Sequence, residues 1–174
     1  MKILVTGSDG QLGYEIKEIS KEFDSHIWKF SKSSSFDLSK YNQIKYFLNK
    51  INPSHIINCA AYTDVDKAEI ESDLADLINH KAIDEISKWT SKNDRKLIHI
   101  STDYVFDGFS ETPLLEDSIP KPINEYGLSK FNGEKVCIKN DNKSIIIRTS
   151  WLYSSYGNNF VKTIINLMKT KNKI

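Results

Sequence analysis

The sequence predicts an α/β fold, a doubly wound parallel sheet with helices on both faces, and three observations predict it. Short apolar runs typical of buried strands alternate with amphipathic helical segments along the chain. A glycine-rich turn joins the first of these runs to the first helix. An irregular span over residues 108–122 holds three of the four prolines and follows the fourth run, where loops of this fold class usually carry function.

Each expected strand is a short run of apolar, often β-branched residues between polar or turn residues. Strands are expected at residues 2–6, 26–30, 55–58, 97–101 and 145–149. Helices are expected over about 11–23, 40–51, 64–90 with a break near Ser72, and 159–171, and another begins just after Asn124. No sixth strand follows the last helix, so we expect a sheet truncated before its sixth strand and a chain that is a fragment of a longer protein.

Composition and charge exclude several classes of protein. The 174 residues are 39% hydrophobic and 27% charged, which is ordinary for one globular domain. A formal charge of +1, with both signs spread along the chain, predicts no nucleic-acid partner and no membrane surface. Cys59 and Cys137 make no disulfide framework, which fits a reducing cytoplasm. The first apolar run is too short for a signal peptide or a membrane span.

The glycine-rich turn has the spacing of a dinucleotide-binding turn. Gly7, Gly10 and Gly13 permit a tight turn, close approach of the backbone to a pyrophosphate, and close packing of helix on strand. An ordinary strand-to-helix loop is the alternative, but the strand before and the helix after the turn favour phosphate binding. We therefore expect residues 1–174 to form a NAD(P)-binding domain of the Rossmann type.

Tyr126 and Lys130 are the candidate catalytic pair. Residues four apart on a helix share a face, and a neighbouring ammonium would lower the pKa of the Tyr126 phenol from its usual value of about 10. Asn124 is a good N-cap residue, which would place Tyr126 in the first turn, at the positive end of the helix dipole. The same spacing occurs twice within residues 41–50, on a helix expected to be solvated, so spacing alone indicates no function.

Taken together, the glycine turn, Thr102 after the fourth strand, Tyr126 and Lys130 resemble the order of a short-chain dehydrogenase of the extended type. Longer blocks narrow the resemblance to the dTDP-4-dehydrorhamnose reductases, and the likeness extends over essentially the whole chain. These blocks are residues 58–69, 101–108, 148–153 and 157–160.

The resemblance implies hydride transfer from a nicotinamide to the C4 ketone of dTDP-4-dehydro-L-rhamnose, giving dTDP-L-rhamnose for surface polysaccharide. Because a ketone that accepts hydride becomes an alkoxide, a donor must protonate its oxygen. Tyr126 is the candidate donor, Thr102 its hydrogen-bonding partner at the carbonyl, and Lys130 the charge that tunes the phenol and holds the nicotinamide ribose.

The same matching implies further contacts, which fall into two sets. The substrate set comprises Thr63, Val65, Thr102, Asp103, Tyr104 and Trp151. The cofactor set comprises Gly7, Gly10, Gln11, Leu12, Gly13, Ser31, Lys32, Asp37, Leu38, Ala60, Ala61, Tyr62, Thr63, Tyr126 and Lys130.

Three of the implied roles have an alternative. Trp151, which follows a strand, could be a core residue instead of a ligand contact. Ser101 could serve in place of Thr102, although strand alternation points only one of the two into a cleft. Asn79 matches a helix asparagine that supports a proton path in the wider family, and a polar residue packed in a helix is the other interpretation.

The choice between NADP(H) and NAD(H) is predicted from the residues at the end of the second strand. No acidic residue is available there to hold a ribose 2′-hydroxyl, whereas Ser31 and Lys32 could accept a 2′-phosphate. We therefore expect NADP(H), with NAD(H) as the other option. Some relatives bind Mg²⁺, and Glu15 occupies a matching place, but we predict no metal site. The expected partner is a dTDP-sugar, and the full-length protein is expected to be a homodimer.

Two other functions share this architecture. A non-catalytic regulatory subunit, such as the one that accompanies methionine adenosyltransferase, binds the dinucleotide without sugar chemistry, and the intact Thr102, Tyr126 and Lys130 count against it. A sugar-nucleotide epimerase or dehydratase shares the Tyr/Lys pair, and the longer blocks favour the reductase over it. Because the carboxyl-terminal part of this family supplies much of the substrate pocket, we expect the chain alone to bind dinucleotide weakly and to turn over poorly.

Overall fold

The computed structural model describes residues 1–141 and 143–170. Five strands form one parallel sheet with the order β2-β1-β3-β4-β5. Their bounds are β1 Lys2–Thr6, β2 Ile27–Ser31, β3 His55–Asn58, β4 Lys96–Thr102 and β5 Ile145–Thr149. Each strand lies within a residue of its predicted position, because short apolar runs between turn residues are a strong local signal for buried strands.

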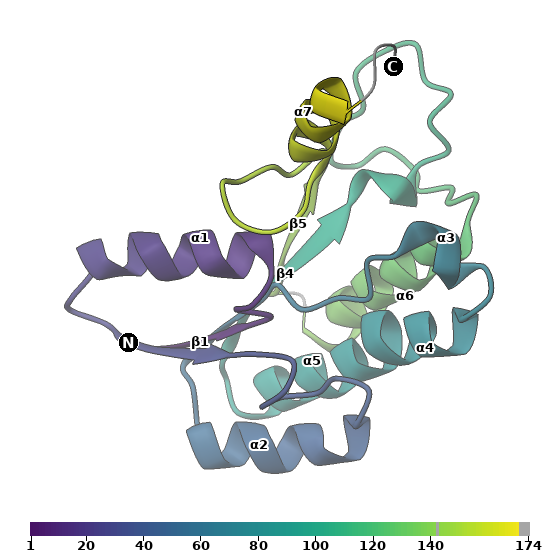
Figure 1. Ribbon diagram of the computed structural model, residues 1–174. Helices are drawn as coiled ribbons and strands as arrows, with labels where there is room; N and C mark the ends of the chain where they lie inside the picture. Colours follow the sequence, from purple (N-terminus) through teal and green to yellow (C-terminus); the bar gives the residue numbers. More distant parts are fainter. Residues whose placement is uncertain (142, 171–174) are drawn as a thin grey trace.

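Within the part of the chain that the structure describes, seven α-helices connect and flank these strands (Figure 1). They are α1 Gln11–Ile19, α2 Ile44–Ile51, α3 Val65–Ala68, α4 Ser72–Asp76, α5 Ala82–Lys92, α6 Glu125–Asn140 and α7 Phe160–Thr170. The predicted break near Ser72 is confirmed between α3 and α4, and a short π-helical stretch, Leu77–Lys81, joins α4 to α5. Lys171, the last residue of the final predicted helix, lies outside the described residues.

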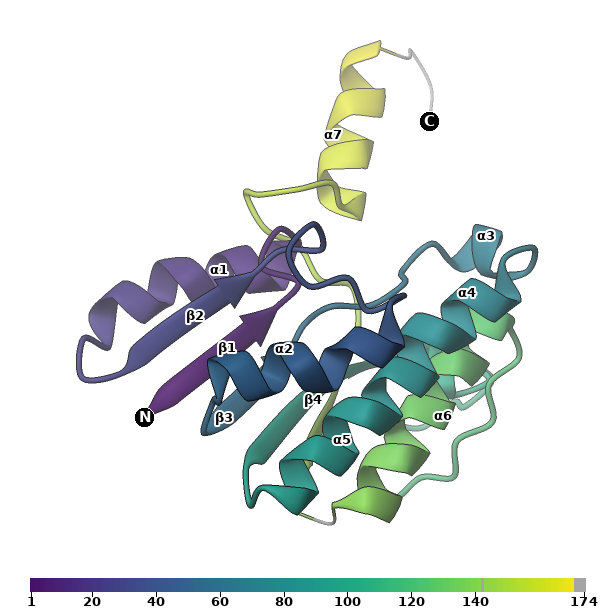
Figure 2. The ribbon, with the colours of Figure 1, turned by 90° about the horizontal axis from the view of Figure 1, so that it is seen from below.

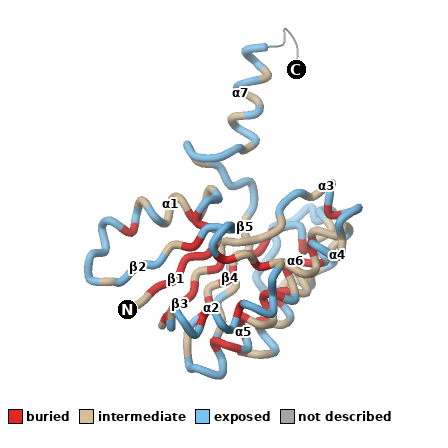
Figure 3. Tube along the Cα trace, turned by 60° about the horizontal axis from the view of Figure 1, so that its bottom comes forward, coloured by how far each residue is buried: buried red, intermediate tan, exposed pale blue. Residues whose placement is uncertain are grey.

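The helices cover both faces of the sheet, which confirms the predicted fold class. Helix α1 lies on one face, whereas α2, α5 and α6 lie on the other, and α7 extends away from the sheet (Figure 2). The main core lies between the sheet and the α2, α5, α6 layer, where Leu4, Ile56 and Leu97 of the central strands pack with Ile83 and Ile86 of α5. In Figure 3, buried positions (red) gather along the middle strands and on the helices beside them. In the described part of the chain, no helix combines the length and the apolar character that crossing a membrane requires.

The strand order reverses between β1 and β3, because β2 lies on one side of β1 and the later strands lie on the other. Ligands of open α/β sheets bind outside the carboxyl ends of the strands at such a reversal. The usual six-strand dinucleotide order has one more strand beside β2. Among the described residues no strand pairs with the outer side of β2. The sheet therefore has the five strands that the sequence predicts, with β2 as an edge strand.

A buried polar chain links three strands close to their carboxyl ends. The Thr6 hydroxyl of β1 donates to the Asn58 side-chain oxygen of β3 at 2.6 Å, and the Asn58 amide nitrogen lies 3.0 Å from Nδ1 of His99 in β4. Burial lowers the pKa of His99 well below its usual value, so the ring stays neutral and its Nδ1 can accept this hydrogen bond. The chain of contacts therefore fixes the relative positions of the strands that carry the cleft.

Helix α6 is held to the sheet and to the π-helical stretch at close range. Glu134 of α6 is fully buried, and its carboxylate accepts two hydrogen bonds from Arg148 of β5, at 2.7 and 3.0 Å. Gly133, the preceding residue, lets the helix approach so closely that a Cβ there would lie 2.2 Å from the carbonyl oxygen of Asn79. The position of α6 is therefore fixed by contacts that tolerate no added side chain.

We predict that Gly133→Ala destabilises the fold although alanine is the better helix former. The overpacking costs about 1–3 kcal/mol, whereas the gain in helix propensity is at most about 1 kcal/mol. Urea unfolding followed by circular dichroism measures the difference, with Lys139→Ala in the exposed last turn of α6 as the control that stays within about 0.5 kcal/mol of the wild type. An unchanged or raised urea midpoint for Gly133→Ala would contradict the close packing of α6.

Candidate active site

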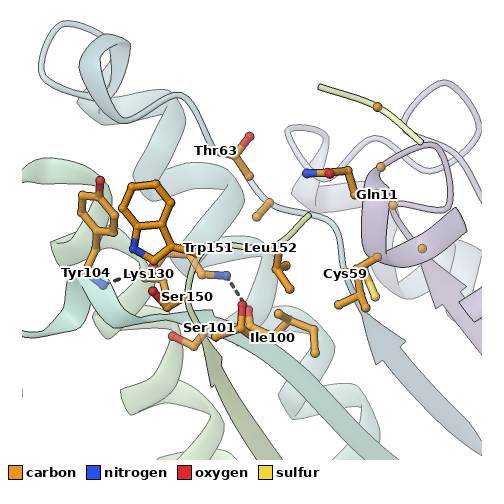
Figure 4. A pocket seen from close by; sticks show the side chains of 18 of the residues that line it. Gln11, Cys59, Thr63, Ile100, Ser101, Tyr104, Lys130, Ser150, Trp151 and Leu152 are labelled. Atoms are coloured by element: carbon orange, nitrogen blue, oxygen red, sulfur yellow. Dashed lines mark hydrogen bonds between the residues drawn. The ribbon is translucent and has the colours of Figure 1, made fainter. Parts of the chain in front are cut away.

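A cleft of about 530 Å³ opens at the carboxyl ends of the strands, beside the reversal in strand order (Figure 4). Segments far apart in the sequence meet there, because the carboxyl ends of parallel strands share one edge of the sheet. Most of the residues predicted for the site line it: Gly7, Gly10, Gln11, Leu12, Gly13, Ala61, Thr63, Val65, Thr102, Asp103, Tyr104, Tyr126, Lys130 and Trp151.

The glycine turn fits a dinucleotide pyrophosphate. Gly7 has a positive φ of 65°, and a Cβ on it would lie 2.7 Å from the Cα of Ala60, in the loop after β3. A Cβ on Gly13 would lie 2.3 Å from the Gly7 carbonyl oxygen. The first N–H groups of α1 lack intrahelical partners and carry the positive end of the helix dipole, which suits an anion. The turn therefore has the backbone approach and the donors that a phosphate requires.

Tyr126 lies in the first turn of α6, as the sequence predicts. The Asn124 side chain accepts a hydrogen bond from the backbone N–H of Gly127 at 2.7 Å, which confirms Asn124 as the N-cap. Burial raises the pKa of the Tyr126 phenol above its usual value, and the nearby Thr102 side chain opposes this rise. Tyr126 and Thr102 both line the cleft.

The predicted electrostatic action of Lys130 on Tyr126 is wrong for this structure. The pKa of Tyr126 is raised, not lowered, and Lys130 is not among the groups that shift it. Lys130 is buried, and its ammonium donates a hydrogen bond of 2.6 Å to the carbonyl oxygen of Ile100 in β4 (Figure 4). Burial lowers the pKa of Lys130 to about 8, so the group remains mainly cationic at neutral pH.

Ser101 and Thr102 at the end of β4 both contribute to the lining of the cleft, but the hydroxyl oxygen of Ser101 is buried, which agrees with the expectation that alternation points only one of the two into the cleft. Ser101 and Thr102 are both buried, because the strand turns directly into a 3₁₀ turn at Asp103–Val105 and the cleft wraps its end. The Thr102 hydroxyl donates to the Asp103 carboxylate at 3.1 Å and accepts from the backbone N–H of Tyr104 at 3.2 Å. The Ser101 hydroxyl has no hydrogen-bond partner in the described part of the chain. Of the two, Thr102 is the residue that influences the pKa of the Tyr126 phenol.

Four of the six predicted substrate residues line a second cavity as well as the cleft. This second cavity, of about 630 Å³, adjoins the cleft and shares Thr63, Asp103, Tyr104 and Trp151 with it. The Tyr104 ring meets the Tyr126 ring edge-on, with the ring centroids 5.6 Å apart. Trp151 is 71% exposed at a φ of 52°, which excludes the alternative of a core residue. These aromatic side chains form an apolar wall beside the phenol.

Several predicted cofactor residues do not line the cleft. Ser31 is buried at the end of β2, and its hydroxyl lies 3.3 Å from that of Ser35, so it does not face a ligand as we expected. Leu38 is buried in the main core, and the Asp37 carboxylate accepts from the hydroxyl and the backbone N–H of Ser39. Lys32 is exposed on the loop after β2. Register and local turns, which the sequence does not reveal, decide these positions.

Two predicted residues of the loop after β3 also lie behind the cleft wall. Ala60 packs against Gly7 from behind, and the Tyr62 hydroxyl donates to Glu71 at 2.7 Å.

Asn79, in the π-helical stretch, is fully buried and holds the loop after β3. It accepts from the backbone N–H of Tyr62 at 2.9 Å and donates to the Tyr62 carbonyl and to the Ser129 hydroxyl, both at 3.0 Å. These contacts agree with the second interpretation of Asn79, a polar residue packed within a helix.

The segment after β5 completes the cleft and carries residues that sequence reasoning missed. Asn159 donates to the Gln11 side chain at 2.9 Å, and the Tyr156 ring stacks on Tyr14 with the centroids 4.1 Å apart. The Gly-Asn-Asn run at 157–159 was the available signal, because turn residues directly before a helix mark a loop end. The cleft residues outside the predicted set are Asp9, Cys59, Ile100, Ser101, Thr149, Ser150, Leu152, Gly157 and Asn158.

The carboxylate considered for a metal has a protein partner. Glu15 accepts a hydrogen bond of 2.5 Å from the Ser154 hydroxyl in the same segment after β5. Across residues 1–141 and 143–170, no three His, Cys, Asp or Glu side chains are grouped as metal ligands would be. Glu15 therefore acts here as a contact between α1 and the segment after β5.

Comparisons with known proteins agree with this geometry. The family described as the RmlD substrate binding domain matches residues 1–174. The dTDP-4-dehydrorhamnose reductase of Shigella flexneri is 38% identical over 176 residues, which covers 100% of this chain and 59% of that protein. The crystal structure of a dTDP-4-dehydrorhamnose reductase from Clostridium acetobutylicum superposes with a TM-score of 0.94 at 40% identity over 99% of this chain and 61% of that one.

A second solved structure, the Bacillus anthracis dTDP-4-dehydrorhamnose reductase in complex with NADP, has a TM-score of 0.92 at 40% identity and covers 99% of this chain and 61% of that one. The chain therefore spans about three fifths of the length of the relatives it matches. More distant structures with bound NAD, such as WbmG of Bordetella bronchiseptica at 18% identity, share the fold alone. On the match over residues 1–174, this chain belongs to the family of the RmlD substrate binding domain.

Proposed function

We propose that the protein reduces the C4 ketone of dTDP-4-dehydro-L-rhamnose to dTDP-L-rhamnose with a nicotinamide dinucleotide. The observation that carries this proposal is the meeting of Thr102, Tyr126 and Lys130 in one cleft with the glycine turn. The names of the relatives support the same reaction. A regulatory subunit without chemistry would need the cleft and the turn but not this trio of side chains.

Each of the three side chains has a role in this reaction that agrees with its surroundings. The bound nicotinamide supplies the hydride. The Tyr126 phenol, whose pKa is raised, is protonated at neutral pH and is placed to donate its proton to the ketone oxygen. Thr102 orients the phenol, and Lys130, fixed by the Ile100 carbonyl, presents a positive charge on the same helix face. That charge favours the negative oxygen that develops during reduction.

The cofactor is proposed as NADP(H) or NAD(H). The sequence favours NADP(H), and the bound NADP of the Bacillus anthracis relative supports that form. Of the two residues that favoured it here, Lys32 is exposed and Ser31 is buried. No metal enters the proposed reaction.

We propose that residues 1–174 form the NAD(P)-binding domain of a longer protein, which is a homodimer that acts in the cytoplasm. The relatives, of which this chain spans about three fifths, support the greater length, and the free Cys59 and Cys137 suit a reducing compartment. Oxidation of NADPH with dTDP-4-dehydrorhamnose, measured for this chain and for a longer form, is expected to be slower for this chain. Equal rates would place the whole substrate pocket within residues 1–174.

We predict that Tyr126→Phe lowers the rate of ketone reduction by about 10²–10⁴-fold, because the phenol proton is lost while the ring stays. Dinucleotide affinity, measured by fluorescence titration, is expected to change little. Tyr46→Phe is the matched control, since Tyr46 has the same spacing to Lys50 but is 73% exposed on α2. A Tyr126→Phe variant with the wild-type rate would remove the proposed donor.

We predict that Lys130 makes the stability of the fold depend on pH between about 8 and 10.4. Its pKa in the folded chain is about 8, against about 10.4 unfolded. Below pH 8 the lysine is charged in both states, and its burial costs roughly 3 kcal/mol, which is relieved as the pH rises through this window. The free energy of unfolding of the wild type relative to Lys130→Met should therefore rise from pH 7 to pH 10.

Lys130→Met also loses the hydrogen bond to Ile100, so the readout is the change of the stability difference between pH 7 and pH 10 and not its size at one pH. Lys139→Met, at an exposed position of α6, is the control and should show no such slope. A pH-independent difference between the wild type and Lys130→Met would show that the ammonium is better solvated than the structure indicates.

A further inference from the structure

A carboxylate from the glycine turn bridges to the loop after β2. The Ser33 hydroxyl donates to Oδ2 of Asp9 at 2.7 Å, and the Ser33 backbone N–H lies 3.3 Å from Oδ2 and 3.4 Å from Oδ1 of Asp9. Asp9 follows β1, Ser33 follows β2, and these strands pair in register up to Thr6 and Ser31. The contact therefore joins two neighbouring loops at the carboxyl edge of the sheet.

This position is where dinucleotide-binding folds distinguish their two cofactors. In such folds an acidic residue near the end of the second strand holds the ribose 2′-hydroxyl, or a basic residue accepts a 2′-phosphate. The second strand here ends in a buried Ser31 and is followed by Lys32, so it offers no carboxylate. Asp9, which lines the cleft beside Gly10, brings a carboxylate to the same place from the first strand's turn.

The charge on Asp9 is well supported. The pKa of its carboxyl lies below the usual value: burial alone would raise it, and the hydrogen bonds from Ser33 together with the charge of Lys32 outweigh that effect. Within the described residues, Oδ1 takes part in one long hydrogen bond, at 3.4 Å, so it has capacity to accept another from a hydroxyl.

The donors that a 2′-phosphate would need are already used within the loop. Ser33 directs both its hydroxyl and its N–H to Asp9. The Ser35 hydroxyl donates to the Lys32 carbonyl at 3.0 Å and accepts from the Lys32 backbone N–H at 3.1 Å. A phosphate placed there would displace these contacts and would face the Asp9 carboxylate at short range, with the Lys32 ammonium as the opposing charge.

We propose that Asp9 is the residue that sets cofactor discrimination, holding the ribose 2′-hydroxyl of NAD(H) and disfavouring the 2′-phosphate of NADP(H). The proposal rests on the proposed function only in that the cleft binds a nicotinamide dinucleotide. It assigns to the first turn a role that the sequence placed at Ser31 and Lys32, and it reverses the cofactor preference expected from them.

Binding measurements on this chain test the proposal without turnover. Dissociation constants for NADH and NADPH are measured by nicotinamide fluorescence, and those for ADP and 2′,5′-ADP by calorimetry, because the second pair isolates the 2′-phosphate. We expect the wild type to bind NADH and ADP more tightly than their 2′-phosphorylated counterparts. In Asp9→Asn, which removes the charge and keeps the shape, the affinity for the 2′-phosphorylated ligand of each pair should rise about tenfold relative to its partner.

Two further variants separate charge from hydrogen bonding and from a general effect of net charge. Asp9→Ala removes the acceptor as well, so it should weaken NADH binding, whereas Asp9→Asn should leave NADH affinity within about threefold. Asp24→Asn changes the net charge equally, but Asp24 lies in the exposed turn before the amino end of β2, away from the cleft. This variant should leave the NADPH-to-NADH and 2′,5′-ADP-to-ADP affinity ratios unchanged.

Two results would overturn the assignment of Asp9. One is a wild type that binds 2′,5′-ADP as tightly as ADP, and the other is an Asp9→Asn variant whose ratios equal those of the wild type. In both cases the dinucleotide still binds, and the proposed function stands. Failure of both NADH and NADPH to bind would contradict the proposed function itself and, with it, the role of Asp9.

Discussion

The cleft depends on the near contact of two backbones, the glycine turn after β1 and the loop after β3. Gly7 lies so close to Ala60 that a Cβ would stand 2.7 Å from the Ala60 Cα, and Gly13 is equally close to the turn itself. Because the strand order reverses between β1 and β3, the loops leave in opposite directions and the space between them opens to ligands. The turn, the amino end of α1 and the end of β4 are thereby brought to face one another.

The reactive side chains are held by polar contacts buried beneath this opening. Lys130 is fixed by a strand carbonyl, Asn79 ties the loop after β3 to α6, and Asn58 joins Thr6 to His99 across three strands. Such buried groups are costly unless paired, and pairing sets their directions. Tyr126, Thr102 and Lys130 consequently stand on a frame that is already fixed on the same cleft.

Sequence reasoning succeeded where the signal is local and failed where it is not. The strands and the Asn124 cap depend on neighbouring residues, and all of them were predictable. The pKa of Tyr126 was not, because burial of the phenol raises it, and the ammonium of Lys130 binds a carbonyl of β4, thirty positions earlier in the chain. The contact between Asp9 and Ser33 spans 24 positions and follows from strand register, which no short motif encodes.

The π-helical stretch between α4 and α5 limits how the length of this chain can vary. A π turn holds about one residue more than an α turn, so removing one residue within 77–81 would restore a regular helix and change the local backbone that positions Asn79. Asn79 would then leave Tyr62 and Ser129, and the carbonyl that faces Gly133 would shift. Insertions and deletions are therefore tolerated in the exposed span 108–122 far better than in this buried turn, where the residue count itself is under constraint.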